Sequence, residues 1–292
     1  MSAVIEARGL SRRYGKRTAV DGIDFTIPAG RIVGLIGPNG SGKTTTLKAA
    51  LGLIPFEGQL TVLGHDPRTE RDALMQDVCF IADVAILPRW LRVGDAIDFV
   101  AGVHPRFNRD KAERYIAHTK LTPSMKVKEM SKGMIVQLHL ALVMAIDAKL
   151  LVLDEPTLGL DLLYRKQFYD TLLNDYFDHS RTIIVTTHQV EEIQQILTDM
   201  MFINNGRIVL DCSMDDFETR YAELTVRPEQ VAEARALKPI NERQVLGRSI
   251  MLFDRADREK LATLGEVRTP SIADLFVAVM TDKTGQTQGA AA

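Results

Sequence analysis

Residues 31–44 read RIVGLIGPNGSGKT, a short apolar run that leads directly into a glycine-rich loop. From Gly37 the order is glycine, four residues, and then Gly-Lys-Thr, the pattern of a phosphate-binding loop between a strand and a helix. Residues 31–36 predict the strand, because short aliphatic runs without alternation are typical of parallel strands buried on both faces. A helix is expected over residues 45–51.

The residue types in this loop suit the binding of a nucleoside triphosphate. Glycines allow backbone N–H groups to approach phosphate oxygens without obstruction by a Cβ atom, and the helix N-terminus adds its positive end. Lys43 is expected to reach the β and γ phosphates, and the Thr44 hydroxyl is expected to bind magnesium. The predicted binding residues of the loop are Gly37, Asn39, Gly40, Ser41, Gly42, Lys43, Thr44 and Thr45.

A second predicted strand ends in two adjacent carboxylates. Residues 150–153 are aliphatic, and Asp154 and Glu155 follow them at the edge of the sheet where ligands bind in such folds. Asp154 is expected to hold magnesium, directly or through water, and Glu155 to orient or deprotonate the water that attacks the γ phosphate. An Asp-Glu-Pro sequence also ends strands as a plain solvated turn, but the phosphate loop favours the catalytic interpretation.

A third predicted strand, residues 182–187, delivers His188 to the same edge. A lone histidine after a strand is more often structural. Because this one follows a strand expected beside the other two, we predict that it hydrogen-bonds the γ phosphate and holds the attacking water in line.

Taken in order, these motifs resemble those of the ATP-binding subunits of ABC transporters, over roughly residues 1–220. Residues 153–157 (Leu-Asp-Glu-Pro-Thr) resemble the second Walker motif of that family, and the phosphate loop resembles its Walker A motif. Residues 159–161 (Gly-Leu-Asp) are similar to its D-loop and residues 186–188 (Thr-Thr-His) to its switch histidine. Tyr14 resembles the aromatic residue that stacks on adenine, with simple packing as the alternative.

The resemblance implies an α/β fold: a P-loop NTPase core with a parallel sheet, an antiparallel β subdomain and a helical insertion, to which a small C-terminal α+β appendage is added. It implies an ATPase that binds ATP and Mg²⁺ and drives export by a separate integral membrane permease. It also implies a dimer, either a homodimer or a pair with a second cassette. Two ATP molecules would lie between the cassettes, each held by one phosphate loop and the signature motif of the other cassette.

Residues 130–134 (Met-Ser-Lys-Gly-Met) lie where the family has its Leu-Ser-Gly-Gly-Gln signature, at the expected spacing before Asp154. The resemblance implies that Ser131 and Gly133 face the partner's γ phosphate from the N-terminus of a helix predicted over residues 134–146. A serine that only caps the helix is the alternative. Asp161 of the D-loop is assigned to the same nucleotide site. Lys132 and Met134 replace the first glycine and the glutamine of the signature, so the motif departs from the family pattern at these positions.

Asp83 stands where the family usually has a glutamine, directly after a strand predicted over residues 78–82. We expect it to reach the metal through water and to take part in catalysis, since hard oxygen ligands suit magnesium. An exposed loop carboxylate is the alternative. Residues 86–91 (Ile-Leu-Pro-Arg-Trp-Leu) then predict an apolar contact site for the membrane subunit, unless Trp90 packs inside the helical subdomain.

The chain is expected to divide into an ATP-binding domain over residues 1–220, with a helical subdomain at about 84–146, and a small α+β domain over residues 221–280. In the smaller domain, strands are predicted over 222–226 and 248–253, and helices over 229–237 and 271–280. Residues 281–292 are small and polar and predict a disordered tail.

Composition limits the other classes of function. The 36 basic and 38 acidic residues nearly balance, so no net field draws the whole protein to nucleic acid. Cys79 and Cys212 lie far apart without a neighbouring ligand cluster, which argues against a zinc site and favours a reduced compartment. No signal pattern and no run of about 18 apolar residues are present. The expected location is the cytoplasm, on the inner face of the membrane through the permease.

The competing hypothesis from another class is a soluble ABC-type ATPase that acts on nucleic acid or ribosomes. Such relatives generally have two cassettes in one chain, a long coiled-coil insertion or zinc-binding cysteines, whereas this sequence has one phosphate loop and a short insertion. A small-molecule kinase with the same loop would leave Ser131, Asp161 and His188 unexplained. The sequence therefore favours the transporter subunit and no nucleic-acid partner.

Overall fold

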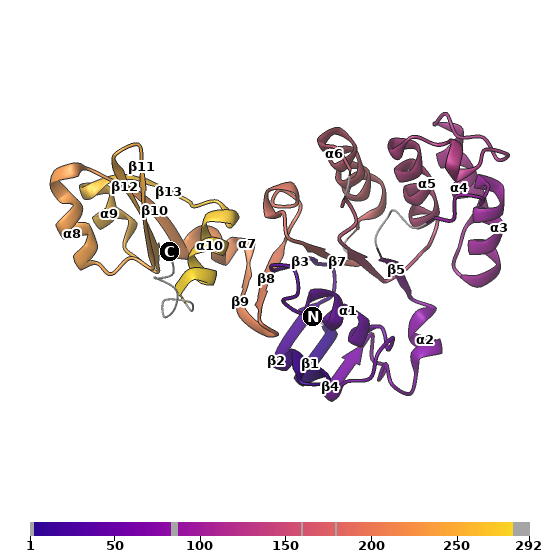
Figure 1. Cartoon of the computed structure of the whole chain (residues 1–292), viewed down its shortest axis with the longest axis horizontal. Helices are drawn as coiled ribbons and strands as arrows, with labels where there is room; N and C mark the ends of the chain where they lie inside the picture. Colours follow the sequence, from indigo (N-terminus) through magenta and orange to yellow (C-terminus); the bar gives the residue numbers. More distant parts are fainter. Residues whose placement is uncertain (1–2, 83–86, 159, 179, 283–292) are drawn as a thin grey trace, which may run out of the picture.

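The computed structural model describes residues 3–82, 87–158, 160–178 and 180–282. A larger lobe holds the elements before β10, and a smaller lobe holds strands β10 to β13 with helices α8 and α9 (Figure 1). The domain boundary expected at residue 220 stays a prediction, although β10 begins at Tyr221.

A six-stranded sheet forms the centre of the larger lobe, in the order β5-β6-β7-β3-β8-β9. All neighbouring pairs are parallel except β8 and β9, which are antiparallel, so the sheet is mixed rather than purely parallel. Every residue of β3, β6 and β7 is buried, which confirms the double-sided burial expected from their aliphatic sequences. The strands are β3 (Ile32–Ile36), β5 (Val78–Ala82), β6 (Leu150–Asp154), β7 (Thr182–Thr187), β8 (Asp199–Asn204) and β9 (Arg207–Ser213).

A second, antiparallel sheet has the order β2-β1-β4 and confirms the expected antiparallel β subdomain. Its strands are β1 (Ala3–Tyr14), β2 (Arg17–Pro28) and β4 (Glu57–Val62). Helix α1 (Lys43–Ala50) joins the two sheets, because Leu47 and Ala50 share one hydrophobic cluster with residues of both. The phosphate loop is therefore fixed between two sheets.

The helical part of the larger lobe has a separate hydrophobic core of residues from α3, α4 and α5. Its elements are α3 (Val93–Val103), α4 (Arg109–Ala117), the 3₁₀ turn η1 (Val127–Glu129) and α5 (Lys132–Met144). Asn108 caps α4, since its side chain accepts from the Lys111 backbone N–H. The shorter α2 (Arg71–Met75) precedes β5, while α6 (Leu162–Thr171), the π-helical η2 (Leu172–Tyr176) and the 3₁₀ turn η3 (Val190–Glu192) follow β6 and β7.

The smaller lobe is a four-stranded antiparallel sheet with the order β11-β12-β10-β13, which confirms an α+β appendage. Helix α7 (Met214–Arg220) leads from β9 into this lobe, and its packing residue Phe217 belongs to the core of the larger lobe. The elements of the smaller lobe are β10 (Tyr221–Val226), η4 (Pro228–Gln230), α8 (Val231–Ala236), β11 (Asn241–Val245), β12 (Arg248–Asp254), α9 (Arg258–Leu264) and β13 (Gly265–Arg268). The helix expected over residues 229–237 is thus a 3₁₀ turn followed by a short α-helix.

The last helix, α10 (Ile272–Asp282), returns to the larger lobe and lies near α7, β8 and β9 (Figure 1). Ile272 and Leu275 belong to the same hydrophobic cluster as residues of the central sheet. The helix runs two residues into the segment predicted as a tail, and the rest of that segment lies outside the described residues.

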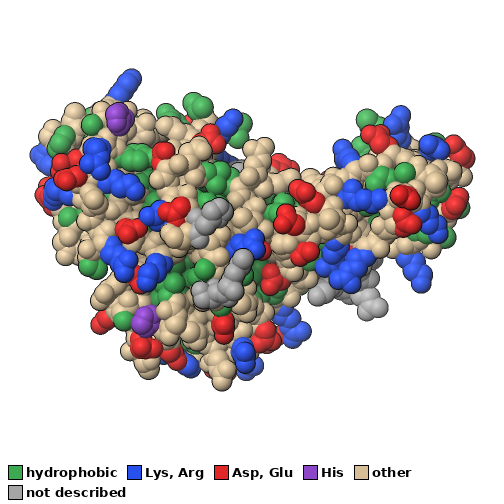
Figure 2. Space-filling view, turned by 180° about the vertical axis from the view of Figure 1, so that it is seen from behind, with side chains coloured by type: hydrophobic (Ala, Val, Ile, Leu, Met, Phe, Trp, Pro, Cys, Tyr) green, Lys and Arg blue, Asp and Glu red, His purple; other side chains and the backbone are tan. Residues whose placement is uncertain are grey.

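The face of the molecule seen in Figure 2 carries both signs of charge. Figure 2 shows Lys, Arg, Asp and Glu side chains interspersed over one face of the molecule, in line with the near-neutral composition. Within the described ranges, no helix combines the length and the apolar character that crossing a bilayer requires.

Candidate active site

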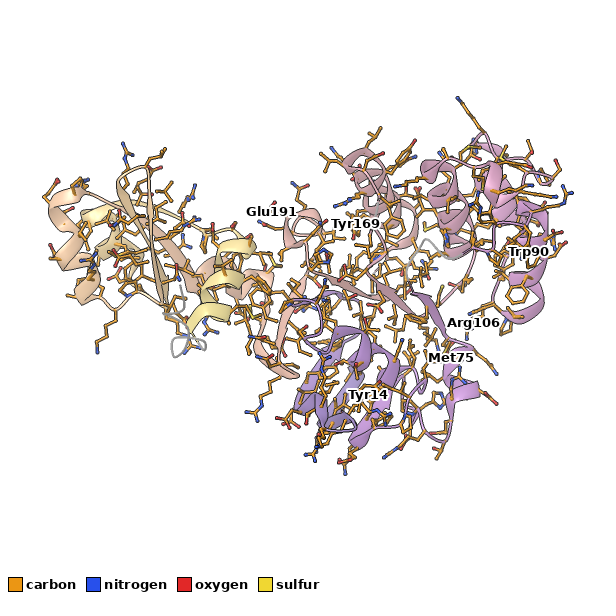
Figure 3. All side chains as sticks on the ribbon, in the orientation of Figure 1. Tyr14, Met75, Trp90, Arg106, Tyr169 and Glu191 are labelled. Carbon is orange, nitrogen blue, oxygen red and sulfur yellow. The ribbon has the colours of Figure 1, made fainter. Side chains whose placement is uncertain are left out.

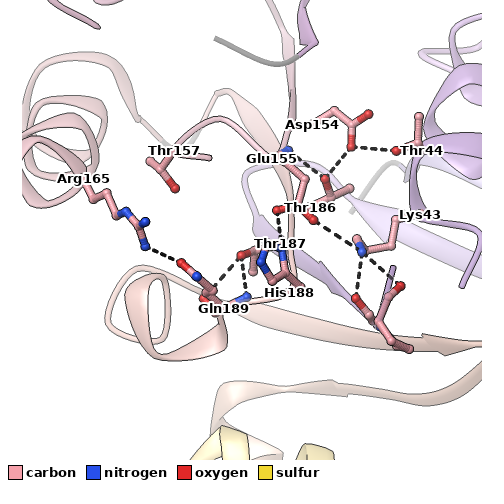
Figure 4. A network of polar contacts seen from close by, with 12 residues as sticks. Lys43, Thr44, Asp154, Glu155, Thr157, Arg165, Thr186, Thr187, His188 and Gln189 are labelled. Atoms are coloured by element: carbon pink, nitrogen blue, oxygen red, sulfur yellow. Dashed lines mark hydrogen bonds and ion pairs between the residues drawn. The ribbon is translucent and has the colours of Figure 1, made fainter. Parts of the chain in front are cut away.

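Strands β6, β7 and β3 are neighbours in the central sheet, so the loops that leave their carboxyl ends meet at one edge. Figure 4 shows that Lys43, Asp154, Glu155 and His188 converge there. The structure therefore brings together the side chains that the three motifs were expected to place together.

The phosphate loop packs too closely for side chains at two of its glycines. A Cβ atom on Gly37 would lie 2.3 Å from the Ile203 carbonyl oxygen, and one on Gly42 would lie 2.6 Å from that of Ala19. Gly42 also has a φ of 116°, a conformation that L residues rarely adopt. These glycines hold the loop against β8 and β2, in addition to exposing its backbone.

Lys43 is buried, and its ammonium group lies among three oxygen acceptors. Its Nζ donates to the Gly37 carbonyl at 2.7 Å and to the Pro38 carbonyl at 3.3 Å, and lies 3.4 Å from Glu155 Oε1. A buried cation at the N-terminus of α1 is suited to attract an anion.

Asp154 accepts two hydroxyl hydrogen bonds on the same carboxylate oxygen. Thr44 Oγ1 donates at 3.1 Å and Thr186 Oγ1 at 2.6 Å. The Thr186 hydroxyl also accepts from the Glu155 backbone N–H at 3.0 Å, so it joins both carboxylate residues. Sequence reasoning gave Thr186 no role in the site, although it stands in the same motif as His188.

Glu155 lies between a cation and an imidazole. Its Oε1 faces Lys43, and its Oε2 is 2.9 Å from His188 Nδ1. Its φ of 50° is in the left-handed region, which costs a non-glycine residue roughly 1–2 kcal/mol. Strain of this kind is concentrated at functional sites, and here it accompanies a carboxylate directed between two catalytic candidates.

A cavity of about 410 Å³ opens beside these groups. Tyr14 and Arg17 enter it from the β1–β2 hairpin, whose last pair they form. Tyr14 is 46% exposed, and the Arg12 guanidinium lies 4.6 Å from its ring centroid. The residues that line the cavity are Tyr14, Arg17, Ala19, Asn39, Gly40, Gly42, Lys43, Thr44, Thr45 and Glu155.

Arg17 is a lining residue that sequence reasoning missed. Its Nη2 donates to the Gly40 carbonyl at 3.1 Å, so the hairpin is bound to the phosphate loop. Only the pairing of β1 with β2 brings it to the loop, and the sequence gave no separate signal for it. Ser41 differs from its neighbours: its buried hydroxyl has no hydrogen-bond partner within the described residues.

The described residues of the signature and the D-loop stand apart from this cavity, whose lining includes none of them. Ser131 caps α5, since its Oγ accepts from the Met134 backbone N–H at 3.3 Å. Asp161 caps α6 in the same way, accepting from Tyr164 at 3.1 Å. Gly133 is buried under the Tyr164 ring, whose Cζ would lie 2.0 Å from an added Cβ. Within one chain these residues define how α5 and α6 begin.

Two further predictions concern the region after β5. Asp83 lies outside the described residues, as does Gly159 of the D-loop. Trp90 is 70% exposed, so the alternative that it packs inside the helical subdomain is wrong (Figure 3). Its indole is available at the surface.

Known proteins are similar to this chain over most of its length. The family model described as "ABC transporter" matches residues 20–158. The Nod factor export ATP-binding protein I of Burkholderia lata is 33% identical over 226 residues, which cover 72% of this chain and 70% of that protein. The uncharacterized ABC transporter ATP-binding protein YdbJ of Bacillus subtilis is 29% identical over 234 residues, or 78% of this chain and 76% of that protein.

Solved structures show the same fold. The structure of an ATP-binding subunit of an ABC transporter superimposes with a TM-score of 0.64 at 23% identity, covering 74% of this chain and 92% of that one. The shared fold thus extends over about three quarters of this chain.

Proposed function

This chain belongs to the ABC transporter family as an ATP-binding subunit that hydrolyses ATP, and from that premise we propose that two copies enclose two ATP molecules and drive export through a membrane permease. The observation that carries the proposal is the position of Glu155, which lines the nucleotide cavity together with Lys43 and lies between Lys43 and His188. The relatives are named as ATP-binding proteins of transport or export, which supports this function over the nucleic-acid alternative.

The chain's own residues account for the steps of hydrolysis. Lys43 exchanges the Gly37 and Pro38 carbonyls for the β and γ phosphates, which are stronger anionic acceptors. Glu155 is thereby released from Lys43 and accepts the proton of the attacking water. His188 holds the Glu155 carboxylate through Nδ1 and keeps it directed at the γ phosphate.

Mg²⁺ fits the donor set beside the phosphate loop. Thr44 and Asp154 bring two hard oxygen ligands within 3.1 Å of each other, and no group of three His, Cys, Asp or Glu side chains elsewhere in the described chain could replace them. When bound, the ion would supply charge neutralisation for the phosphates.

The second copy of the chain completes the nucleotide site. Ser131 lies exposed at the N-terminus of α5, outside its own chain's cavity, where the free N–H groups of a helix end attract anions. Leu162 and Leu163 are 78% and 72% exposed, and Leu158 is also exposed. We call these three leucines, which flank Asp161 in the sequence, the D-loop patch. An apolar patch next to a signature helix is suited to cover by a second copy.

The permease is proposed to bind the helical part of the larger lobe. Trp90 lies exposed before α3, and on α3 the exposed side chains of Phe99 and Val103 are four residues apart, hence on one face. Exposed aromatic and aliphatic groups of this kind mark partner sites. Binding there would hold the chain on the inner, cytoplasmic face of the membrane.

The proposal is tested by ATP hydrolysis at increasing protein concentration. If two copies form the active unit, the activity per chain rises with concentration as dimers accumulate. Glu155→Gln should remove hydrolysis while leaving ATP binding intact, since glutamine has the same size but cannot accept the proton. An activity per chain that stays constant while light scattering shows only monomers would contradict the two-copy mechanism.

A further inference from the structure

The segment after His188 is fixed by a compact set of hydrogen bonds. The Gln189 backbone N–H donates to Thr187 Oγ1 at 2.9 Å, and that hydroxyl donates to the Gln189 carbonyl at 3.3 Å. The side-chain oxygen of Gln189 accepts from Arg165 Nη1. His188, which lies between Thr187 and Gln189 and is only partly buried, therefore depends on its neighbours for its position.

Arg165 extends from α6 and makes a second bond in another direction. Its Nε donates to the Leu160 carbonyl at 2.7 Å. Leu160 belongs to the segment between Glu155 and Asp161. The exposed leucines of the D-loop patch precede and follow it in the sequence. One guanidinium group thus bridges the segment after the catalytic glutamate and the segment after the catalytic histidine. Figure 4 shows the bond from Arg165 to Gln189.

Arginine is specifically suited to this position. A planar guanidinium donates through fixed, divergent N–H groups and can hold two acceptors at a constant separation, whereas a lysine ammonium is a compact point charge on a flexible stem. Arg165, His188 and Gln189 also line one cavity of about 390 Å³, whose other wall is formed by Ala273, Phe276 and Val277 of α10. They do not line the nucleotide cavity, so an effect on nucleotide binding is not expected.

We propose that Arg165 is a positioning residue for ATP hydrolysis: through Gln189 it holds His188 against Glu155, and through Leu160 it makes this position respond to a second copy docked on the D-loop patch. The inference rests on the proposed two-copy function. It assigns the link between copies and catalysis to one side chain that contacts neither the nucleotide cavity nor the reacting atoms.

The first test compares steady-state ATP hydrolysis of Arg165→Ala and Gln189→Ala with that of Lys166→Ala, a neighbouring exposed cation on the same helix. Both test variants should lower kcat on the order of tenfold to a hundredfold, the usual effect of misplacing a catalytic group by about 1 Å. KM for ATP should stay within about twofold, because neither residue lines the nucleotide cavity. The Lys166 control should retain the wild-type kcat.

Two further variants, Arg165→Ala/Gln189→Ala and Arg165→Lys, distinguish a positioning role of Arg165 from an effect on protein stability alone. If Arg165 acts through Gln189, the Arg165→Ala/Gln189→Ala protein loses no more kcat than the more impaired single variant. Arg165→Lys keeps the positive charge but lacks the planar guanidinium group, so its kcat should lie between that of Arg165→Ala and that of the wild type. Multiplicative losses in the double variant, or full rescue by lysine, would overturn the inference.

The dimer assay separates failure of this inference from failure of the proposed function. In the Glu155→Gln background, Arg165→Ala should still allow the ATP-dependent dimer. If Glu155→Gln alone forms no ATP-dependent dimer, the proposed two-copy function is contradicted. If a folded Arg165→Ala protein has the wild-type kcat, only the inference about Arg165 is contradicted. If Arg165→Ala does not fold, Gln189→Ala tests the inference instead, because it removes the acceptor of the bond from Arg165 Nη1. A kcat of Gln189→Ala equal to that of Lys166→Ala would overturn the inference.

Discussion

Thr186 gives the catalytic edge its geometry at the scale of single atoms. Its hydroxyl donates to Asp154 and accepts from the Glu155 backbone, so one oxygen fixes both carboxylate residues. The roles expected of Asp154 and Glu155 followed from a motif, whereas this bond depends on the register between β6 and β7, in which Asp154 pairs with Thr186. Strand register is a tertiary property that a single sequence does not reveal.

We expect Thr186→Val to lower kcat about tenfold or more and to reduce stability by roughly 1–3 kcal/mol, because an isosteric valine leaves buried polar groups unpaired. ATP hydrolysis and urea unfolding measure the two effects. Thr182→Val is the matched control: it lies on the same strand and accepts from the Gly30 backbone N–H at the opposite end. Equal losses of kcat in the two variants would show that the strand as a whole, and not the bond to Asp154, is responsible.

The two cysteines predict how stability depends on pH. Burial raises the pKa of the Cys79 thiol to about 12, and burial is also the main cause that raises the pKa of Cys212 to about 11. A raised folded-state pKa means that the folded protein keeps its proton while the unfolded chain loses it above pH 9.0. The contribution of each buried thiol to the free energy of unfolding is therefore complete below pH 9, and it is lost as the pH rises toward the pKa of that thiol in the folded protein.

Urea unfolding at pH 8 and pH 10 tests this expectation. The wild type should lose about 1.4 kcal/mol per cysteine for each pH unit above the unfolded-state pKa. Cys79→Ala should be less stable at pH 8 but should lose less between pH 8 and pH 10 than the wild type does. An identical loss in both proteins would exclude the Cys79 thiol as a source of the dependence.

At the scale of elements, the contact between α5 and α6 explains why residue 133 is a glycine. The family resemblance assigned Gly133 only to nucleotide binding. Gly133 lies in the first turn of α5, and the Tyr164 ring of α6 occupies the space of its missing side chain. We expect Gly133→Ala to destabilise the protein by roughly 1–3 kcal/mol through overpacking. In a Tyr164→Ala background the same substitution should cost much less.

Thermal or urea unfolding of the two single variants and the double variant gives this coupling energy. A cost of Gly133→Ala that is equal in both backgrounds would mean that Tyr164 relaxes freely and that the glycine is not required for packing. The activity of the double variant then shows whether Gly133 has a second role at the nucleotide.

The central strands were largely predictable, since β3, β6 and β7 are short buried aliphatic runs followed by chemistry-bearing loops. Helices α1 and α5 begin earlier than the predicted residues 45 and 134, because of the residues that precede them. Helix α5 begins at Lys132 because the Ser131 side chain caps it, and α1 begins at Lys43 because Gly42 adopts a left-handed conformation. The antiparallel strand β9 was not predicted, although Asn205-Gly206, both with positive φ, is a typical hairpin signal before it.

At the scale of the whole molecule, the C-terminal lobe is bound to the ATP-hydrolysing lobe by more than its connecting chain. Helix α10 contributes Ile272 and Leu275 to the core cluster of the central sheet, and Phe276 meets Phe202 of β8 edge to face at a centroid distance of 5.3 Å. The sequence predicted this helix but not its partner, because packing between segments so far apart follows only from the complete fold.

The most direct test of the two-copy mechanism is the mass of the Glu155→Gln protein in solution, measured by light scattering with and without saturating ATP. We predict a single chain of 32.5 kDa without ATP and twice that mass with it, because unhydrolysed ATP holds the copies together. Adding Lys43→Ala to this protein should abolish the shift, since the phosphates lose their cation. A mass of 32.5 kDa at saturating ATP, with ATP binding demonstrated independently, would contradict the mechanism.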